Sequence, residues 1–295
     1  MVRYGNFLYF LPIAVLISAL FLAHHLTNRF GKKFSRKLIL ILLWSNFALH
    51  IVKQFTPYYF QRWPASLSES SATNFCALLI MVWPFIFLGN NKYLKDYAYY
   101  VGMLSAAAAY LIPTGPLNLD LGSIENFFEV VRFYGCHAPL LICGYLMVKD
   151  GFHKLDYRRL WALPLVMVGF NLVILLNGMF FYAVNFPGYT QDWQTLIARD
   201  GWLSGAAVFG PPLFMDKFLA PIYRISIPYL MVYYDNGLLR FTPSIWMLPS
   251  LYIAVAIIGP LMTYPFQKHE MRADFEGFKQ KMKMRRKSRL INTKK

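Results

Sequence analysis

The segment Val131–Val148 reads VRFYGCHAPLLICGYLMV and is apolar over almost its whole length. Crossing the hydrocarbon core of a bilayer takes a helix of about 20 residues, so this segment is long enough to span a membrane. It contains one histidine, His137, a short way inside its first end. An imidazole in hydrocarbon is costly and needs a partner. The segment therefore predicts a membrane helix that carries a candidate functional residue.

The composition extends this prediction to the whole chain. Hydrophobic residues make up 57% of the sequence and charged residues 15%, whereas soluble domains average about 25% charged. Further apolar runs lie at about 7–26, 38–54, 73–88, 97–113, 160–183 and 246–266. The pattern predicts an all-α polytopic membrane bundle of about seven transmembrane helices. We expect residues 1–266 to form this membrane domain and residues 267–295 to form a basic tail.

The positive charge is concentrated beside the apolar runs. The net charge is +16, and eleven of the thirty Lys and Arg residues follow Pro265. Basic residues at such positions set orientation and meet anionic lipid, so the charge does not indicate nucleic acid. The basic loops 27–37, 89–96 and 149–159 fall on one side together with the tail. This bias predicts an outer amino terminus and a cytoplasmic carboxyl terminus.

The connections between the runs differ in character. Residues 55–72, with two prolines and a serine-rich stretch, predict an exposed connection. The acidic loop 114–130 has no histidine or close ligand spacing, which favours a solvated loop over a metal site. Residues 185–245 predict an outer interfacial cap, and a re-entrant course for 202–234 stays open. The small residues 105–109 predict close helix packing rather than ligand binding.

Polar residues cluster at one end of the second apolar run. Asn46, His50 and Lys53 are spaced by four and three residues, so they share one helix face. Polar groups at this depth are expected to face the protein interior or the interface rather than lipid.

The alternating direction of the helices brings distant residues to one level. His50 lies near the outer end of its helix, and Cys76 and His137 lie just inside the outer ends of theirs. A neighbouring base favours the nucleophilic thiolate, so a Cys76–His137 pair could attack the ester carbonyl of a glycerolipid. His50 or Asn46 could orient the imidazole or hold the oxyanion. Inert packing of the cysteine and a structural hydrogen bond of the histidine remain the alternatives.

A resemblance to a known family adds to this interpretation. The run NFCALLIMVWPFIFLGNNKYLKDYAYYVGMLSAAAAYLIP (residues 74–113), and the later segments RFYGCHAPLLICGYLMVKDGF and LNGMFFYAV, are similar to the bacterial YwaF family of integral membrane proteins. That family is related to transmembrane protein 164 of animals. The similarity is carried by Cys76, by Tyr99, Tyr100 and Gly102, and by Cys136 with His137. Asn74 stands where many members have histidine.

The resemblance implies a function and a location. The animal relatives are regarded as Cys–His acyltransferases of phospholipids, which implies Cys76 as nucleophile and His137 as base. It also implies the plasma membrane of a bacterium, lipid partners and no cofactor. Two alternatives stay open: a non-catalytic subunit or scaffold that binds proteins through the tail and cap, or a transporter of lipid or small solutes.

Overall fold

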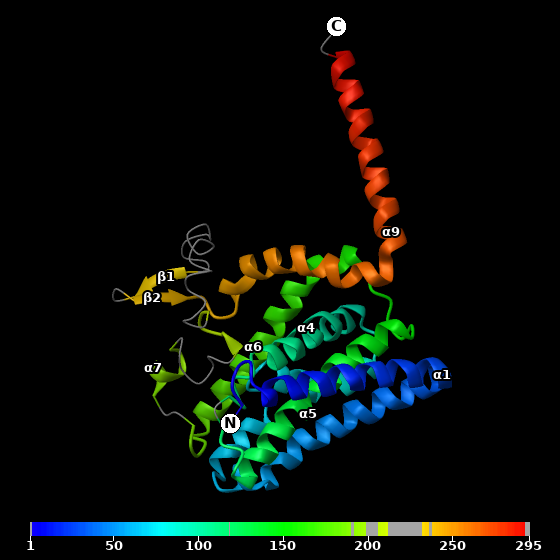
Figure 1. Cartoon of the computed structure of the whole chain (residues 1–295). Coiled ribbons are helices and arrows are strands. Elements are labelled where there is room, and N and C mark those ends of the chain that lie inside the picture. The colour runs from blue at the N-terminus through cyan, green and yellow to red at the C-terminus, as the bar shows by residue number, and fades with distance from the viewer. Residues whose placement is uncertain are drawn as a thin grey trace.

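The computed structural model describes residues 2–117, 119–189, 192–198, 206–211, 232–235 and 238–292. The predicted all-α class is confirmed with one exception, a small two-stranded hairpin (Figure 1). The main helices are α1 (Phe7–Val52), α3 (Phe75–Leu88), α4 (Lys92–Leu111), α5 (Ile124–Lys149), α6 (Leu163–Ala183) and α9 (Leu248–Asn292). Short helical segments are η1 (Lys53–Phe55), α2 (Pro57–Phe60), η2 (Ala65–Ser70), η3 (Tyr157–Ala162), α7 (Trp193–Leu196) and η6 (Ile245–Met247).

Helix α1 folds back on itself and supplies two arms. The turn is at Gly31, whose φ of 76° and ψ of −174° are not helical. A positive φ is accessible to glycine because it has no Cβ. The arms, residues 7–30 and 32–52, correspond to the first two apolar runs of the sequence (Figure 1).

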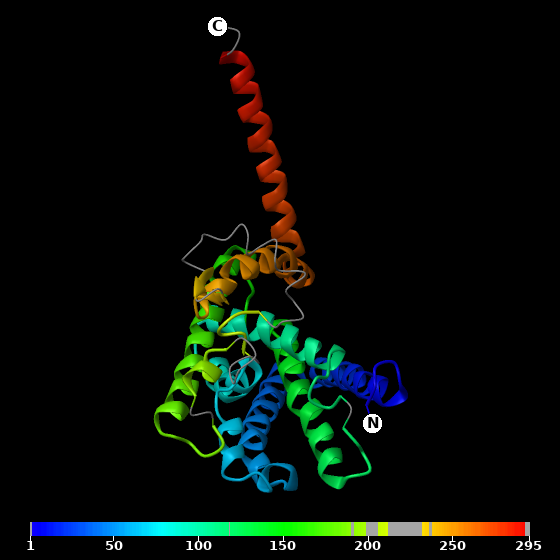
Figure 2. The same cartoon turned by 90° about the vertical axis from the view of Figure 1, so that its left-hand side faces the viewer.

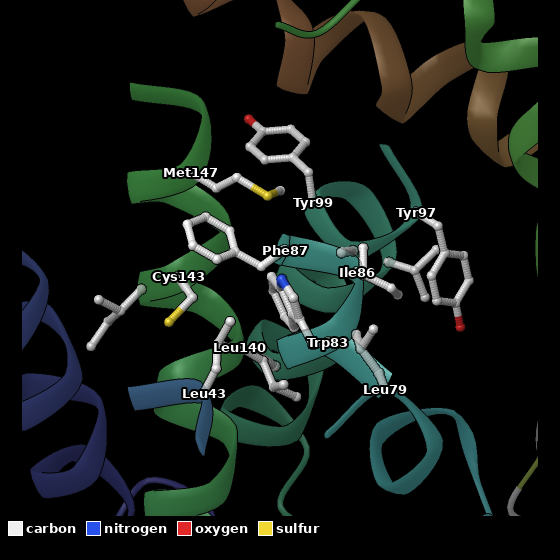
Figure 3. Packing of buried hydrophobic residues seen from close by; sticks show 14 of the residues in the cluster. Leu43, Leu79, Trp83, Ile86, Phe87, Tyr97, Tyr99, Leu140, Cys143 and Met147 are labelled. Carbon is white, nitrogen blue, oxygen red and sulfur yellow. The ribbon is translucent and has the colours of Figure 1, made fainter. Parts of the chain in front are cut away.

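The core lies where α1, α3, α4 and α5 pack together (Figure 3). Trp83 of α3 is fully buried there, with Leu140, Cys143 and Met147 of α5 beside it. Two glycines let the helices approach. A Cβ on Gly102 would lie 2.8 Å from Cζ3 of Trp83, and one on Gly144 would lie 2.6 Å from Cγ of Met103. Small residues at helix crossings therefore set the α3–α4 and α4–α5 distances.

Residues 55–72 are only in part the exposed connection that their composition predicts, since Phe55, Phe60 and Trp63 are exposed but other side chains are buried. They form η1, α2 and η2, and the side chains of Tyr59, Ser66 and Ser68 are buried. The Ser66 hydroxyl donates to Oε1 of Gln54 at 3.0 Å. Buried polar groups need such partners. Here the partner lies in η1, just before the segment, so the composition of residues 55–72 does not predict the burial.

Helix α9 contains a sharp bend. Gln267 has non-helical angles, and its side chain is buried against the loop before η3, where Nε2 donates to the Leu155 carbonyl at 2.7 Å. Beyond the bend, the basic tail continues as a helix to Asn292 and projects away from the other helices in both views (Figures 1 and 2).

The expected cap at 185–245 is described only in part. It contains α7 and the antiparallel strands β1 (Val232–Asp235) and β2 (Leu238–Phe241), which the apolar and proline-rich sequence does not predict. The segment 202–234, for which a re-entrant course stayed open, lies largely outside the described residues.

The length and hydropathy of several helices support membrane insertion. Among the described residues, four helices are long and apolar enough to span a membrane: Phe7–Phe55, Ile124–Lys149, Tyr157–Ala183 and Ile245–Met284. Large apolar side chains face outward on them, including Phe21, Ile41, Leu176 and Leu261, as a lipid-facing surface requires. Helix α3 has 14 residues, short for a full crossing. The count of about seven spans and the orientation of the termini stay predictions.

The basic segments expected on one side of the membrane lie together. Lys32 donates to the Gly151 carbonyl at 3.2 Å, which joins loop 27–37 to loop 149–159. The start of α4, the same 149–159 loop and the α9 bend line one cavity. These contacts gather the basic loops at a single end of the bundle.

Candidate active site

A cavity of about 760 Å³, here called the thiol cavity, lies at the other end of the bundle. Its wall comprises the end of the second α1 arm, the start of α3, the end of α4 and the first turns of α5, with η1, α2 and η2 alongside. Cys76, His137 and His50 all line it. Helices that run in alternating directions thus bring these three residues to the wall of one cavity, although they are far apart in the sequence.

Cys76 is held in the first turn of α3. The preceding Asn74 is the N-cap residue, and its Oδ1 accepts a hydrogen bond from the Ala77 amide at 2.9 Å. Such a cap satisfies an amide that the helix itself leaves free. Asn74 therefore fixes the start of the helix that carries the thiol. Cys76 is half-buried, and Ser105 of α4 lies close enough to interact with it.

The ring of His137 is fixed by its own helix. Its Nδ1 lies 2.6 Å from the Phe133 carbonyl oxygen, and the rings of the two residues are 4.5 Å apart. A carbonyl only accepts hydrogen bonds, so Nδ1 carries the proton in neutral imidazole. Nε2 is then left as the basic nitrogen. In this tautomer Nε2 is the nitrogen that can accept a proton.

His50 and Asn46 occupy different positions. Both are buried, with 3% and 2% of their surfaces exposed, which confirms that the polar face of this helix points inward. His50 lines the thiol cavity, and its Nε2 has no hydrogen-bond partner among the described residues. Asn46 does not line it. Its Nδ2 donates to the Cys136 carbonyl at 2.8 Å, which ties α1 to α5 behind the cavity wall.

One part of the thiol cavity is charged, and of its members the sequence pattern indicates only Lys53. Nε of Arg132 donates to Oε2 of Glu129 at 2.6 Å. Nζ of Lys53 donates to the Glu69 carbonyl at 2.7 Å. Lys53 and Arg132 lie 5.0 Å and 5.3 Å from the ring centroid of Tyr59. The Glu129–Arg132 spacing of three residues on one helix is the signal that could have indicated this pair.

Tyr59 holds this charged part together. Its hydroxyl donates to Oε1 of Glu129 at 3.2 Å. Burial raises the pKa of Tyr59 well above its ordinary value, because a buried phenolate would lose its hydration. The phenol therefore stays a hydrogen-bond donor at any ordinary pH.

The small residues of α4 contribute to the cavity as well as to packing. Ala106 is fully buried, as a packing role predicts. Ser105, Ala108 and Ala109, however, line the thiol cavity. Their short side chains leave room beside Cys76 that larger residues would fill.

The other two cysteines have distinct surroundings. Cys136 is buried in the cavity wall, with its Sγ 3.8 Å from a terminal guanidinium nitrogen of Arg132. Cys143 is fully buried in the core, with its Sγ 3.9 Å from the Ile39 carbonyl. Cys143 has no access to the thiol cavity and offers an inert control.

The apolar outer surface and the long apolar helices define an integral membrane helix bundle. The model of the TMEM164 family matches residues 4–191, well over half of the chain, and the protein belongs to that family. The match includes α1 to α6 and every residue named in the thiol cavity. It confirms the relation to transmembrane protein 164 predicted from the sequence, while the resemblance to the YwaF family stays a prediction. No curated protein and no solved structure matches the chain.

Proposed function

We propose that the protein is a membrane-embedded Cys–His acyltransferase or hydrolase of phospholipid acyl esters, with Cys76 as nucleophile and His137 as general base. One observation carries the proposal. The thiol and the imidazole line a single cavity, and the hydrogen bond from Nδ1 to the Phe133 carbonyl leaves Nε2 of the imidazole free to take a proton.

The chemistry uses side chains alone. Nε2 of His137 takes the thiol proton, and the thiolate of Cys76 attacks the ester carbonyl carbon. The carbon–oxygen ester bond breaks, the departing alkoxide takes the proton from His137, and a thioester remains. Water or a lysolipid hydroxyl then attacks the thioester and gives its proton to His137. The carbon–sulfur bond breaks, and the proton returns to the thiolate of Cys76.

The cavity wall suits an amphipathic substrate. Lys53 provides positive charge for a phosphate beside the Arg132–Glu129 ion pair, while Ser105, Ala108 and Ala109 leave an apolar space beside the thiol. Phosphate is bound well by ammonium and guanidinium groups. A phospholipid with its headgroup near Arg132 could place an acyl ester near Cys76. His50 could supply a hydrogen bond to the oxyanion.

The test is acyl transfer by purified full-length protein in mixed micelles that contain a diacyl phospholipid and a radiolabelled lysophospholipid. We expect labelled diacyl lipid or, for a hydrolase, free fatty acid. Cys76→Ala should abolish both products, because an alanine cannot form the thioester. Cys143→Ala, a cysteine removed from the core, should retain them. Equal product from Cys76→Ala would exclude this nucleophile, and no product from the parent protein would favour a non-catalytic membrane subunit.

Two narrower parts of the proposal rest on the sequence alone. We propose that the protein lies in the plasma membrane of a bacterium, and that its tail and cap bind protein partners.

A further inference from the structure

A second cavity, here called the basic cavity, lies at the opposite end of α4 from the thiol cavity. Its volume is about 470 Å³, and it is lined by the start of α4, the loop that leads into η3, and the bend of α9. Five basic side chains contribute to its wall: Lys92, Lys95, Lys154, Arg158 and Arg159. Only two carboxylates line it, those of Asp156 and Glu270.

The floor of the basic cavity is built from a buried charged network. Nε of Arg159 donates to Oδ2 of Asp96 at 2.7 Å, and Nε2 of His153 lies 2.7 Å from Oδ1 of the same carboxylate. Asp96 and His153 are both buried. Buried ionic groups are costly unless they are paired in good geometry. This network therefore fixes the loop against α4 and uses the charge of Arg159.

The remaining charges do not balance. Lys154 pairs with Glu270 at 3.3 Å, and Arg158 pairs with Asp274. Lys92 and Lys95 have no acidic partner among the residues that the structure describes. They are three residues apart on α4, so both lie on one face in its first turn, where the helix dipole adds positive potential. Two unpaired ammonium groups thus border a hollow whose other cations are already paired.

We propose that the basic cavity is a binding site for a phosphate group. Lys92 and Lys95 would provide charge-assisted hydrogen bonds to the phosphate oxygens. Basic residues beside a membrane commonly attract anionic lipid without a defined site. The hollow, the fixed floor and the two neighbouring lysines without an acidic partner distinguish this place from a general basic surface. The phosphate could belong to a lipid headgroup or to a soluble compound, and acyl transfer at Cys76 is not required for either.

Isothermal titration of the full-length protein in neutral detergent tests the proposal with two probes. Dioctanoyl phosphatidic acid represents a lipid headgroup, and pyrophosphate represents a soluble phosphate compound. Lys92→Gln/Lys95→Gln should weaken binding of the preferred probe by about tenfold or more, which corresponds to about 1.4 kcal/mol or more. Both lysines lie outside the ion pairs, so this variant should fold.

The matched control is Lys33→Gln/Lys37→Gln, which removes the same charge from exposed positions at the same end of the bundle. It should bind like the parent protein. Loss with phosphatidic acid alone would identify a headgroup site, and loss with pyrophosphate alone a soluble ligand. An equal effect of the two double variants, or no binding of either probe, would overturn the proposal. Binding by Cys76→Ala should be unchanged, which separates this result from the catalytic test.

Discussion

At the scale of single residues, the orientation of His137 makes a specific prediction. His137→Gln keeps a side chain of similar length but has no basic nitrogen. If Nε2 transfers the proton, kcat for acyl transfer should fall by about 10²- to 10⁴-fold, while the thermal unfolding midpoint in detergent stays near that of the parent protein. A variant that retains more than a third of the parent kcat would show that the imidazole is structural.

The candidate residues were only partly predictable at this scale. Cys76, His137 and His50 reach one cavity because helices that cross a membrane alternate in direction, and apolar runs in the sequence reveal that alternation. The apolar runs do not reveal how each helix is rotated about its own axis, so they do not show which side chains face the cavity. Asn46 lies behind the wall, where it donates to the Cys136 carbonyl, and Tyr59 reaches the site from the segment predicted to be an exposed connection.

At the scale of helices, the α3–α4 contact should depend on Gly102. In Gly102→Ala the new Cβ would meet Trp83 at 2.8 Å and Leu79 at 3.0 Å. Overpacking of this kind costs about 1–3 kcal/mol. Gly169→Ala on α6 is the control, since its Cβ would meet nothing within 4 Å, and alanine favours a helix by about 1 kcal/mol. Thermal unfolding in detergent should rank Gly102→Ala below the parent protein and Gly169→Ala at or above it. Equal midpoints for the two variants would contradict tight α3–α4 packing.

The helices themselves followed well from the sequence, because long apolar runs have few other stable forms in a membrane. The segments between them did not. In residues 55–72, the buried Ser66 is bonded to Gln54 of η1 and the half-buried Ser70 to the His50 carbonyl of α1. The sequence of the segment itself does not reveal these partners. The basic tail has no proline after Pro265, and it continues as a helix through Gly277 to Asn292.

At the scale of the whole molecule, the prediction concerns orientation. An alkaline phosphatase fused after a chosen residue is active only outside the bacterial cytoplasm. With an outer amino terminus and about seven crossings, a fusion after Asp120 should be active, and fusions after Asp156 and Lys295 should have only background activity. Enzyme activity in intact cells measures this directly. An active fusion after Lys295 would require an even number of crossings or the opposite orientation.

Helix α4 has the two proposed sites at its two ends. Lys95 and Ala108 are separated by about 20 Å along the helix axis, given a rise of about 1.5 Å per residue. Between these two residues, the hydroxyls of Tyr99 and Tyr100 form hydrogen bonds with Met262 and Thr263 of α9. One helix therefore forms part of the wall of both cavities, and a substitution that shifts α4 against α9 should change the shape of both.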